Sequence, residues 1–305
     1  TVTQVNNDLA IQTITTTGNV SLTASSGSIT DADLDAAVDV FATDLSMTAS
    51  GNIGTTAANG DIDTTVNSLT ASSTTLGDIV VGETDGLNIA GLTTADGDII
   101  VTAAADMTVG GNVSAGNGGQ VILTAGAGSI FTLAGDILTD GGNVTATGIR
   151  TVLGANSLID TEQGGNSAAG DVNLSATPIS ASGAGFSLTI DASGTTGGTV
   201  ELPLFNNADG NFVDTLSVTT NGTIEFNNAI TTASAQSYTG SSTLNANTVL
   251  TSNSSGNISF AGTVDGARTL TVNTSGETTF GGVVGGTVNL TSLTTDAGGT
   301  TSLNG

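Results

Sequence analysis

The chain has 305 residues and a net charge of −25, with only two basic residues, Arg150 and Arg268, and no His or Cys. Without His and Cys it cannot form a zinc finger, a thiol nucleophile or a Ser-His-Asp triad. Its charge opposes binding to nucleic-acid phosphates. No segment has the roughly 18 apolar residues that a membrane-spanning helix needs. We therefore expect neither nucleic-acid binding nor membrane insertion.

The balance of acidic residues predicts an all-β protein. Asp outnumbers Glu by 22 to five, and Asp favours turns, whereas Glu is typical of helix surfaces. Thr, Val and Ile, which favour strands, are abundant. We expect short strands separated by frequent turns.

A short phrase recurs along the chain: Gly, then Asn or Asp, then a β-branched residue that opens an alternating strand. Its copies begin at Gly18, Gly51, Gly60, Gly77, Gly97, Gly111, Gly135, Gly142, Gly170 and Gly256. The stronger copies are spaced by about 20 to 30 residues, a period typical of solenoids. We interpret the Asn residues, which also create glycosylation sequons, as stacked columns inside the turns.

The segment DADLDAAVDVFATDL (31–45) departs from this phrase. Its apolar residues fit helical spacing, but Val38 and Val40 also alternate as in a strand. We favour strand over helix here.

Acidic residues of the same segment form a candidate calcium site. Asp31, Asp33, Asp35 and Asp39 have the odd-position spacing of the start of an EF-hand loop, but Ala occupies the sixth and twelfth positions of that pattern. This argues against an EF-hand and leaves a looser Ca²⁺ site at Asp31, Asp33 and Asp35. Solvated turn carboxylates are the alternative interpretation.

Three further acids, Asp85, Asp96 and Asp98, are a second candidate Ca²⁺ group. The i,i+2 pairs Asp96/Asp98 and Asp61/Asp63 place two carboxylates on one strand face, as glycoside hydrolysis requires. Such an enzyme also needs cations to hold acidic sugars, and the chain has only two. We therefore expect no enzyme activity and no catalytic residue.

The stretch from about 150 to 215 is expected to be irregular and rich in loops, because Pro178, Pro203 and Gly/Asn-rich segments interrupt the pattern there.

The C-terminal third gives the sharpest register. GNISFAGTVDGARTL (256–270) aligns with GETTFGGVVGGTVNL (276–290) at an offset of 20. The alignment includes the final residues of the two segments, Leu270 and Leu290. The alignment extends to one column, Tyr238, Phe260, Phe280 and Leu303, which we expect to face inward. A longer period of 77 residues would place Phe226 in equivalence with Leu303.

A unit of about 20 residues matches one coil of a parallel β-solenoid, since a propeller blade needs about twice that length. We expect about 11 to 14 coils in one continuous solenoid over residues 1–305, which we interpret as a segment of a longer repeat array.

These phrases resemble the repeats of filamentous-haemagglutinin-like exoproteins and giant autotransporter-type bacterial adhesins. The resemblance is carried by GNVSLTASSGSITDA (18–32), TDLSMTASGNIGT (43–55), GGQVILTAGAGSI (118–130), NAITTASAQSYTGSSTLNANTVLTS (228–252) and FAGTVDGARTLTVNTSGETTFGGVVGG (260–286). It implies a right-handed parallel β-helix, export across a Gram-negative envelope to the cell surface or medium, and roles in adhesion, biofilm or filament building. It supplies no catalytic residue.

The sequence therefore predicts a secreted structural or adhesive solenoid segment that requires no cofactor, with Ca²⁺ as the one candidate ion. The expected partners are further copies or neighbouring repeats, stacked end to end through unpaired strand edges, and surface glycans. A calcium- or glycan-binding module is the alternative, followed by a polysaccharide-degrading enzyme.

Overall fold

The computed structural model describes residues 1–164, 167–174, 178–296 and 298–305. These residues form 34 short strands and no helix, so none of them belongs to a helix that could cross a membrane. The strands stack in parallel as a β-solenoid of about 13 turns, as the repeat period predicted. The chain divides into two compact units, Thr1–Ile149 and Arg150–Gly305, and each is described separately.

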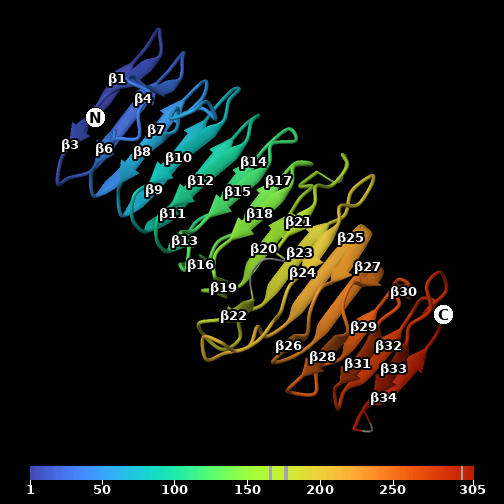
Figure 1. Ribbon diagram of the computed structural model, residues 1–305. Helices are drawn as coiled ribbons and strands as arrows, with labels where there is room; N and C mark the ends of the chain where they lie inside the picture. The colour runs from blue at the N-terminus through green and yellow to red at the C-terminus, as the bar shows by residue number, and fades with distance from the viewer. Residues whose placement is uncertain (165–166, 175–177, 297) are drawn as a thin grey trace. The chain divides into compact units, whose positions relative to one another are not determined.

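Three columns of parallel strands build the first unit (Figure 1). Strands of successive coils pair along each column, except that β5 is connected to β10 only by single bridges of Ile53 to Ile29 and to Ile79. The first column contains β1 (Val2–Gln4), β4 (Val20–Ala24), β7 (Asp44–Ala49), β9 (Ser68–Ser73), β11 (Leu87–Thr94), β13 (Met107–Val109), β14 (Val113–Ala115), β16 (Ile130–Leu133) and β17 (Ile137–Thr139). The second contains β2 (Leu9–Ile11), β5 (Ile29–Asp31), β10 (Ile79–Glu83), β12 (Ile99–Ala103), β15 (Val121–Thr124) and β18 (Val144–Thr147). The third contains β3 (Ile14–Thr15), β6 (Val40–Phe41) and β8 (Ile62–Thr65), which pairs with the end of β10.

The second unit repeats this plan. One column contains β20 (Ser157–Asp160), β23 (Leu188–Ala192), the first half of β25 (Leu216–Phe226), the first half of β27 (Gln236–Leu244), β29 (Ile258–Phe260), β32 (Glu277–Phe280) and β34 (Thr300–Leu303). Another contains β21 (Val172–Asn173), β24 (Val200–Leu202), the second halves of β25 and β27, and β30 (Val264–Asp265). The last contains β19 (Arg150–Leu153), β22 (Ile179–Ala181), β26 (Ile230–Thr232), β28 (Thr248–Ser252), β31 (Thr269–Asn273) and β33 (Ser292–Thr295).

The stretch from 150 to 215 contains short strands, β19 to β24, but most of its described residues lie in the turns and loops between them; its residues 165–166 and 175–177 lie outside the described part. That the whole chain forms one continuous solenoid stays a prediction.

Burial alternates along the strands, as in β4, where every second residue is buried. Because successive side chains of a strand point to opposite faces, each coil places small and branched apolar residues inside. Coil length also agrees with the prediction of about 20 to 30 residues: Leu9 pairs with Ile29, 20 positions later, and Ile53 with Ile79, 26 positions later.

The polar residue of the recurring phrase lies at one corner of the coils in the first unit. Its side-chain oxygen accepts a hydrogen bond of 2.8 to 3.0 Å from the backbone N–H of the equivalent residue one coil later. The successive members of this turn ladder are Asp8, Ser28, Asn52, Asp78, Asp98 and Gln120. Turn residues thus stack from coil to coil, but this ladder is not the predicted column of Asn residues, because Asn52 is its one Asn. The ladder satisfies backbone N–H groups that the sheet does not reach.

The predicted aromatic column is also confirmed. Tyr238 pairs with Phe260, Phe260 with Phe280, and Phe280 with Leu303. The rings of Tyr238 and Phe260 stack with centroids 5.2 Å apart, as do those of Phe260 and Phe280. The three aromatic side chains are buried, whereas Leu303 is 65% exposed.

Two details of the predicted alignment are wrong. Leu270 pairs with Leu293, not Leu290, because the loop after β32 carries extra residues that shift the register. The 77-residue period fails as well, because Phe226 pairs with Leu244 and therefore lies in a different column from Leu303.

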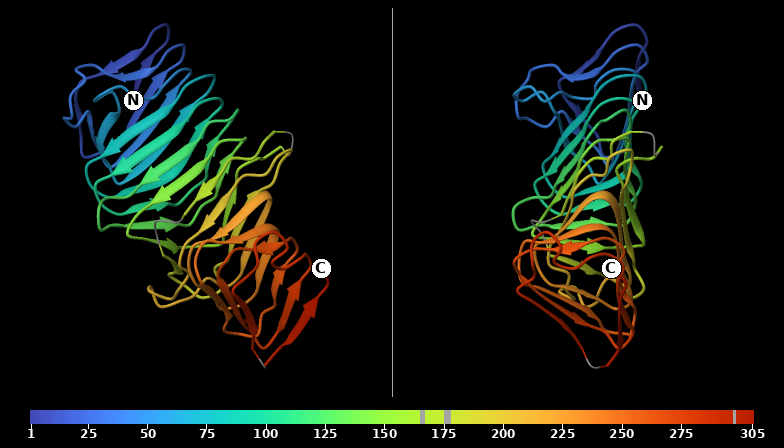
Figure 2. Two further views of the ribbon diagram at one scale, coloured as in Figure 1. Left: turned by 45° about the vertical axis from the view of Figure 1, so that its right-hand side comes forward. Right: turned by 90° about the vertical axis from the view of Figure 1, so that its right-hand side faces the viewer.

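The segment 31–45 contains no helix, so the helical alternative is wrong. Strands form at its two ends, up to Asp31 and from Val40, while residues 32–39 form an irregular loop. In Figure 2 this loop is part of the blue excursion beside the first coils. The Asp and Ala residues of this loop do not favour a strand, and they give a helix no large apolar face to pack against a neighbouring element.

Candidate functional site

The loop 32–39 and its ends bring three carboxylates together. One oxygen from each of Asp31, Asp33 and Asp39 lies within 4.8 Å of the other two. Asp31 and Asp39 are 6% and 2% exposed, whereas Asp33 faces solvent. The cluster thus has a buried base and an open side, and it is the one group of three metal-ligating side chains among the described residues.

The parallel ladder fixes both ends of the loop. Asp31 ends β5 and pairs with Ile11 of the preceding coil. The backbone of Asp39 accepts from Ile14 N–H at 2.7 Å and donates to Asp63 O at 2.8 Å. Between these points the chain reverses at Leu34, whose φ of 53° lies in the left-handed region. The sheet therefore positions the two buried carboxylates, and the loop supplies the third.

Hydrogen bonds occupy only part of the carboxylates. Asp31 Oδ1 accepts from Asp33 N–H at 3.0 Å, and Asp39 Oδ2 accepts from Asp63 N–H at 3.0 Å. Asp33 Oδ2 accepts from Gln12 Nε2 at 3.2 Å. The remaining oxygen of Asp31, Oδ2, is buried and has no hydrogen-bond partner.

Burial and crowding of like charges perturb the acids of this region. Burial raises the pKa of Asp39 to about 7; the hydrogen bond from Asp63 N–H lowers it, and the carboxylate of Asp31 raises it further. Burial also raises the pKa of Asp63 to about 6, together with the nearby carboxylate of Asp61. The cluster thus carries negative charge in a place where charge is costly.

The other predicted calcium ligands lie elsewhere. Asp35 is exposed and its Oδ1 accepts from Ala37 N–H, so it caps the loop instead of joining the cluster. Asp98 belongs to the turn ladder, where its two oxygens accept from the backbone and side-chain nitrogens of Gln120 at 3.0 and 2.9 Å. Asp85 lines a separate hollow, and Asp96 lies at the turn before Gly97.

Asp61 and Asp63, the predicted carboxylate pair, line an open hollow of about 450 Å³ together with Glu83. A Cβ atom at Gly82 would lie 2.6 Å from Asp61 Oδ2 and 3.0 Å from Asp63 Oδ1. The two carboxylates therefore converge over Gly82, and a larger residue there would push them aside.

Glu83 is a buried acid that sequence reasoning missed. It is 4% exposed, and its Oε2 accepts from Thr64 Oγ1 at 2.8 Å and from Val66 N–H at 3.1 Å. Burial raises its pKa to about 7, although these hydrogen bonds lower it. Its position gives a signal: Glu83 ends β10 two residues after Val81 and four after Ile79, so the period of two places it on the same inward face as these residues.

Both arginines have partners within the second unit. Arg150 Nε forms an ion pair with Asp209 at 2.9 Å, and Arg268 Nε donates to Asn245 O at 2.9 Å.

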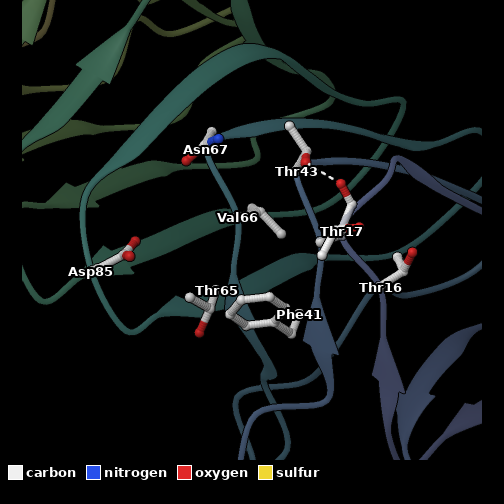
Figure 3. A pocket seen from close by; sticks show the side chains of 9 residues that line it. Thr16, Thr17, Phe41, Thr43, Thr65, Val66, Asn67 and Asp85 are labelled. Carbon is white, nitrogen blue, oxygen red and sulfur yellow. Dashed lines mark hydrogen bonds between the residues drawn. The ribbon is translucent and has the colours of Figure 1, made fainter.

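A second hollow, of about 260 Å³, crosses four successive coils of the first unit (Figure 3). Phe41, which is 45% exposed, lines it together with Thr residues, Asn67 and Asp85. Phe41 pairs with Thr65 along β6 and β8. Sequence reasoning missed Phe41 as a surface residue, although Val40 and Phe41 must face opposite sides of their strand.

Comparison of the chain with protein-family models, with curated proteins and with solved structures gives no match. The adhesin resemblance therefore rests on the repeat phrases themselves.

Proposed function

We propose that this chain is an extracellular structural and adhesive β-solenoid segment of a bacterial surface or secreted filamentous protein, from an organism with a Gram-negative-type envelope. The observation that carries the proposal is the parallel register between successive coils of each unit, maintained by the turn ladder and the stacked core. A scaffold in which each coil repeats the one before it extends a surface without needing a reaction centre.

Charge supports an extracellular, surface-forming role. With 27 acids and two bases, like-charged faces of neighbouring molecules repel, which keeps the flanks soluble. Association is then directed to the unpaired strand edges of terminal coils, where backbone groups pair regardless of side-chain charge. We propose further copies or neighbouring repeats as the partners at these edges.

Attachment of beads coated with the purified chain tests the adhesive role. We expect such beads to attach to epithelial cells or to a polysaccharide film under flow more firmly than beads coated with polyglutamate of similar charge. Sedimentation of the free protein tests the structural role, since edge pairing gives concentration-dependent assembly. A chain that neither attaches nor assembles would contradict the proposal.

The Phe41 hollow favours glycan binding as a second function on the same scaffold. A sugar ring can place its apolar C–H face on an exposed aromatic ring while its hydroxyl groups pair with amide, carboxylate and hydroxyl groups. Because coils are spaced by about 4.8 Å, four coils give a hollow roughly 14 Å long, which suits a short oligosaccharide. The charge of the chain favours neutral over acidic glycans.

The variant F41A should lose binding to an array of neutral oligosaccharides at least tenfold, because it removes the stacking face. L76A is the matched control, since Leu76 is 61% exposed in the same unit but does not line the hollow. Equal glycan binding by F41A and the wild-type chain would refute this second function.

A further inference from the structure

We propose that Asp31, Asp33 and Asp39 bind one Ca²⁺ ion. This inference is independent of adhesion, because it concerns a metal site inside the first unit. It rests on the convergence of the three carboxylates and on one buried oxygen of Asp31 that has no hydrogen-bond partner.

Asp31 Oδ2 is the decisive atom. It is buried and has no hydrogen-bond partner, and its residue belongs to the group of three Asp residues that each place one oxygen within 4.8 Å of the others. A buried carboxylate oxygen without a partner is costly, and such groups in proteins are paired or coordinate a metal. The chain contains no Lys and no His, and both arginines lie in the second unit. A cation from solution is the partner that this oxygen lacks.

The ligand set favours Ca²⁺. All three ligands are carboxylate oxygens, which hard cations prefer. Two oxygens bound to one Ca²⁺ at 2.3–2.6 Å are at most about 5 Å apart, so the observed limit of 4.8 Å fits around one ion. Mg²⁺ demands shorter bonds of about 2.1 Å and near-ideal octahedral geometry. The exposed side at Asp33 leaves room for water to complete the larger coordination shell of Ca²⁺.

The ion would link the two ends of the loop directly. Asp31 ends β5 in the second column, and Asp39 precedes β6 in the third. Asp39 is also hydrogen-bonded through Oδ2 to Asp63 N–H in the next coil. Binding would therefore hold the corner between two columns and stabilise the first unit against unfolding, since any ligand that binds only the folded state does so.

Calcium titration of the full chain in 0.15 M NaCl, followed by calorimetry and by thermal unfolding, tests this site. We expect one Ca²⁺ per chain with a Kd of about 1 mM or tighter, and a higher Tm with Ca²⁺ than with equal Mg²⁺. The variant D31N should bind Ca²⁺ at least tenfold more weakly. It keeps an oxygen for Asp33 N–H, and its amide can donate to the neighbouring carboxylates, so it should fold.

D44N is the matched control, because it removes the same charge from the first unit outside both predicted calcium groups and should bind like the wild-type chain. D39N is the second test variant and should also weaken binding, with circular dichroism confirming that each variant is folded. The proposal is overturned if the wild-type chain shows no saturable binding up to about 10 mM Ca²⁺, ten times the weakest usual Kd. Equal binding by D31N and D44N, or equal stabilisation by Mg²⁺, also overturns it.

Discussion

Replacing Glu83 with Gln should stabilise the protein at alkaline pH. Glu83 points inward at the end of β10, and the ionised side chain must be accommodated at a position where the core excludes most water. The Gln carbonyl can accept the hydrogen bonds from Thr64 Oγ1 and Val66 N–H that Glu83 Oε2 accepts now. The substitution therefore removes the charge and keeps the main contacts.

The magnitude follows from the pKa of Glu83, which burial raises from 4.5 to about 7. A raised pKa means that the folded state holds the proton more tightly than the unfolded state. The protonated side chain thus contributes stability that is complete below pH 4.5 and is lost as the pH rises to about 7. At 1.36 kcal/mol per unit, and discounted for the open hollow beside Glu83, this amounts to about 2 kcal/mol.

Urea unfolding followed by far-UV circular dichroism at pH 5 and pH 8 measures this effect. The free energy of unfolding of the wild-type chain should be higher at pH 5 than at pH 8, and E83Q should reduce that difference by about 2 kcal/mol. E201Q, on β24 in the second unit, removes the same charge and controls for the change in net charge. If the free energy of unfolding depends on pH in the same way in E83Q and in the wild-type chain, ionisation of Glu83 is not the cause of the loss of stability.

Two further substitutions test the core and the turns. F260A removes a ring stacked on Phe280 and should destabilise the second unit by about 3–5 kcal/mol, as measured by chemical unfolding; L303A, at an exposed position of the same column, should cost less than about 1 kcal/mol. D98A removes the acceptor for two nitrogens of Gln120 and should cost about 1–2 kcal/mol, whereas D98N keeps one acceptor and should cost less.

The solenoid could be predicted from the sequence because its coils repeat in the chain. The glycine phrases and the offset of 20 residues set the register, and stacking placed Tyr238 on Phe260 and Phe260 on Phe280. Prediction failed where the coil length changes: extra residues after β32 move Leu293 into the place expected for Leu290. A repeat-based alignment assumes constant offset, and loops change length at little cost in stability.

The candidate site was only partly predictable. Asp31 and Asp33 were expected as ligands from their spacing, but Asp39 completes the group and Asp35 does not join it. The backbone hydrogen bonds to the neighbouring coil decide which carboxylate of the loop turns inward. At Asp39, the backbone N–H donates to the carbonyl oxygen of Asp63. That contact joins residues 24 positions apart, so local spacing does not encode it.

The proposed structural and adhesive role is tested most directly by incubating the purified chain with immobilised neutral and acidic polysaccharides, while both retained protein and released reducing ends are measured. We expect retention of the chain without release of reducing ends. Release of reducing ends that D61N or D63N abolishes would contradict it, because the carboxylate pair above Gly82 would then be catalytic.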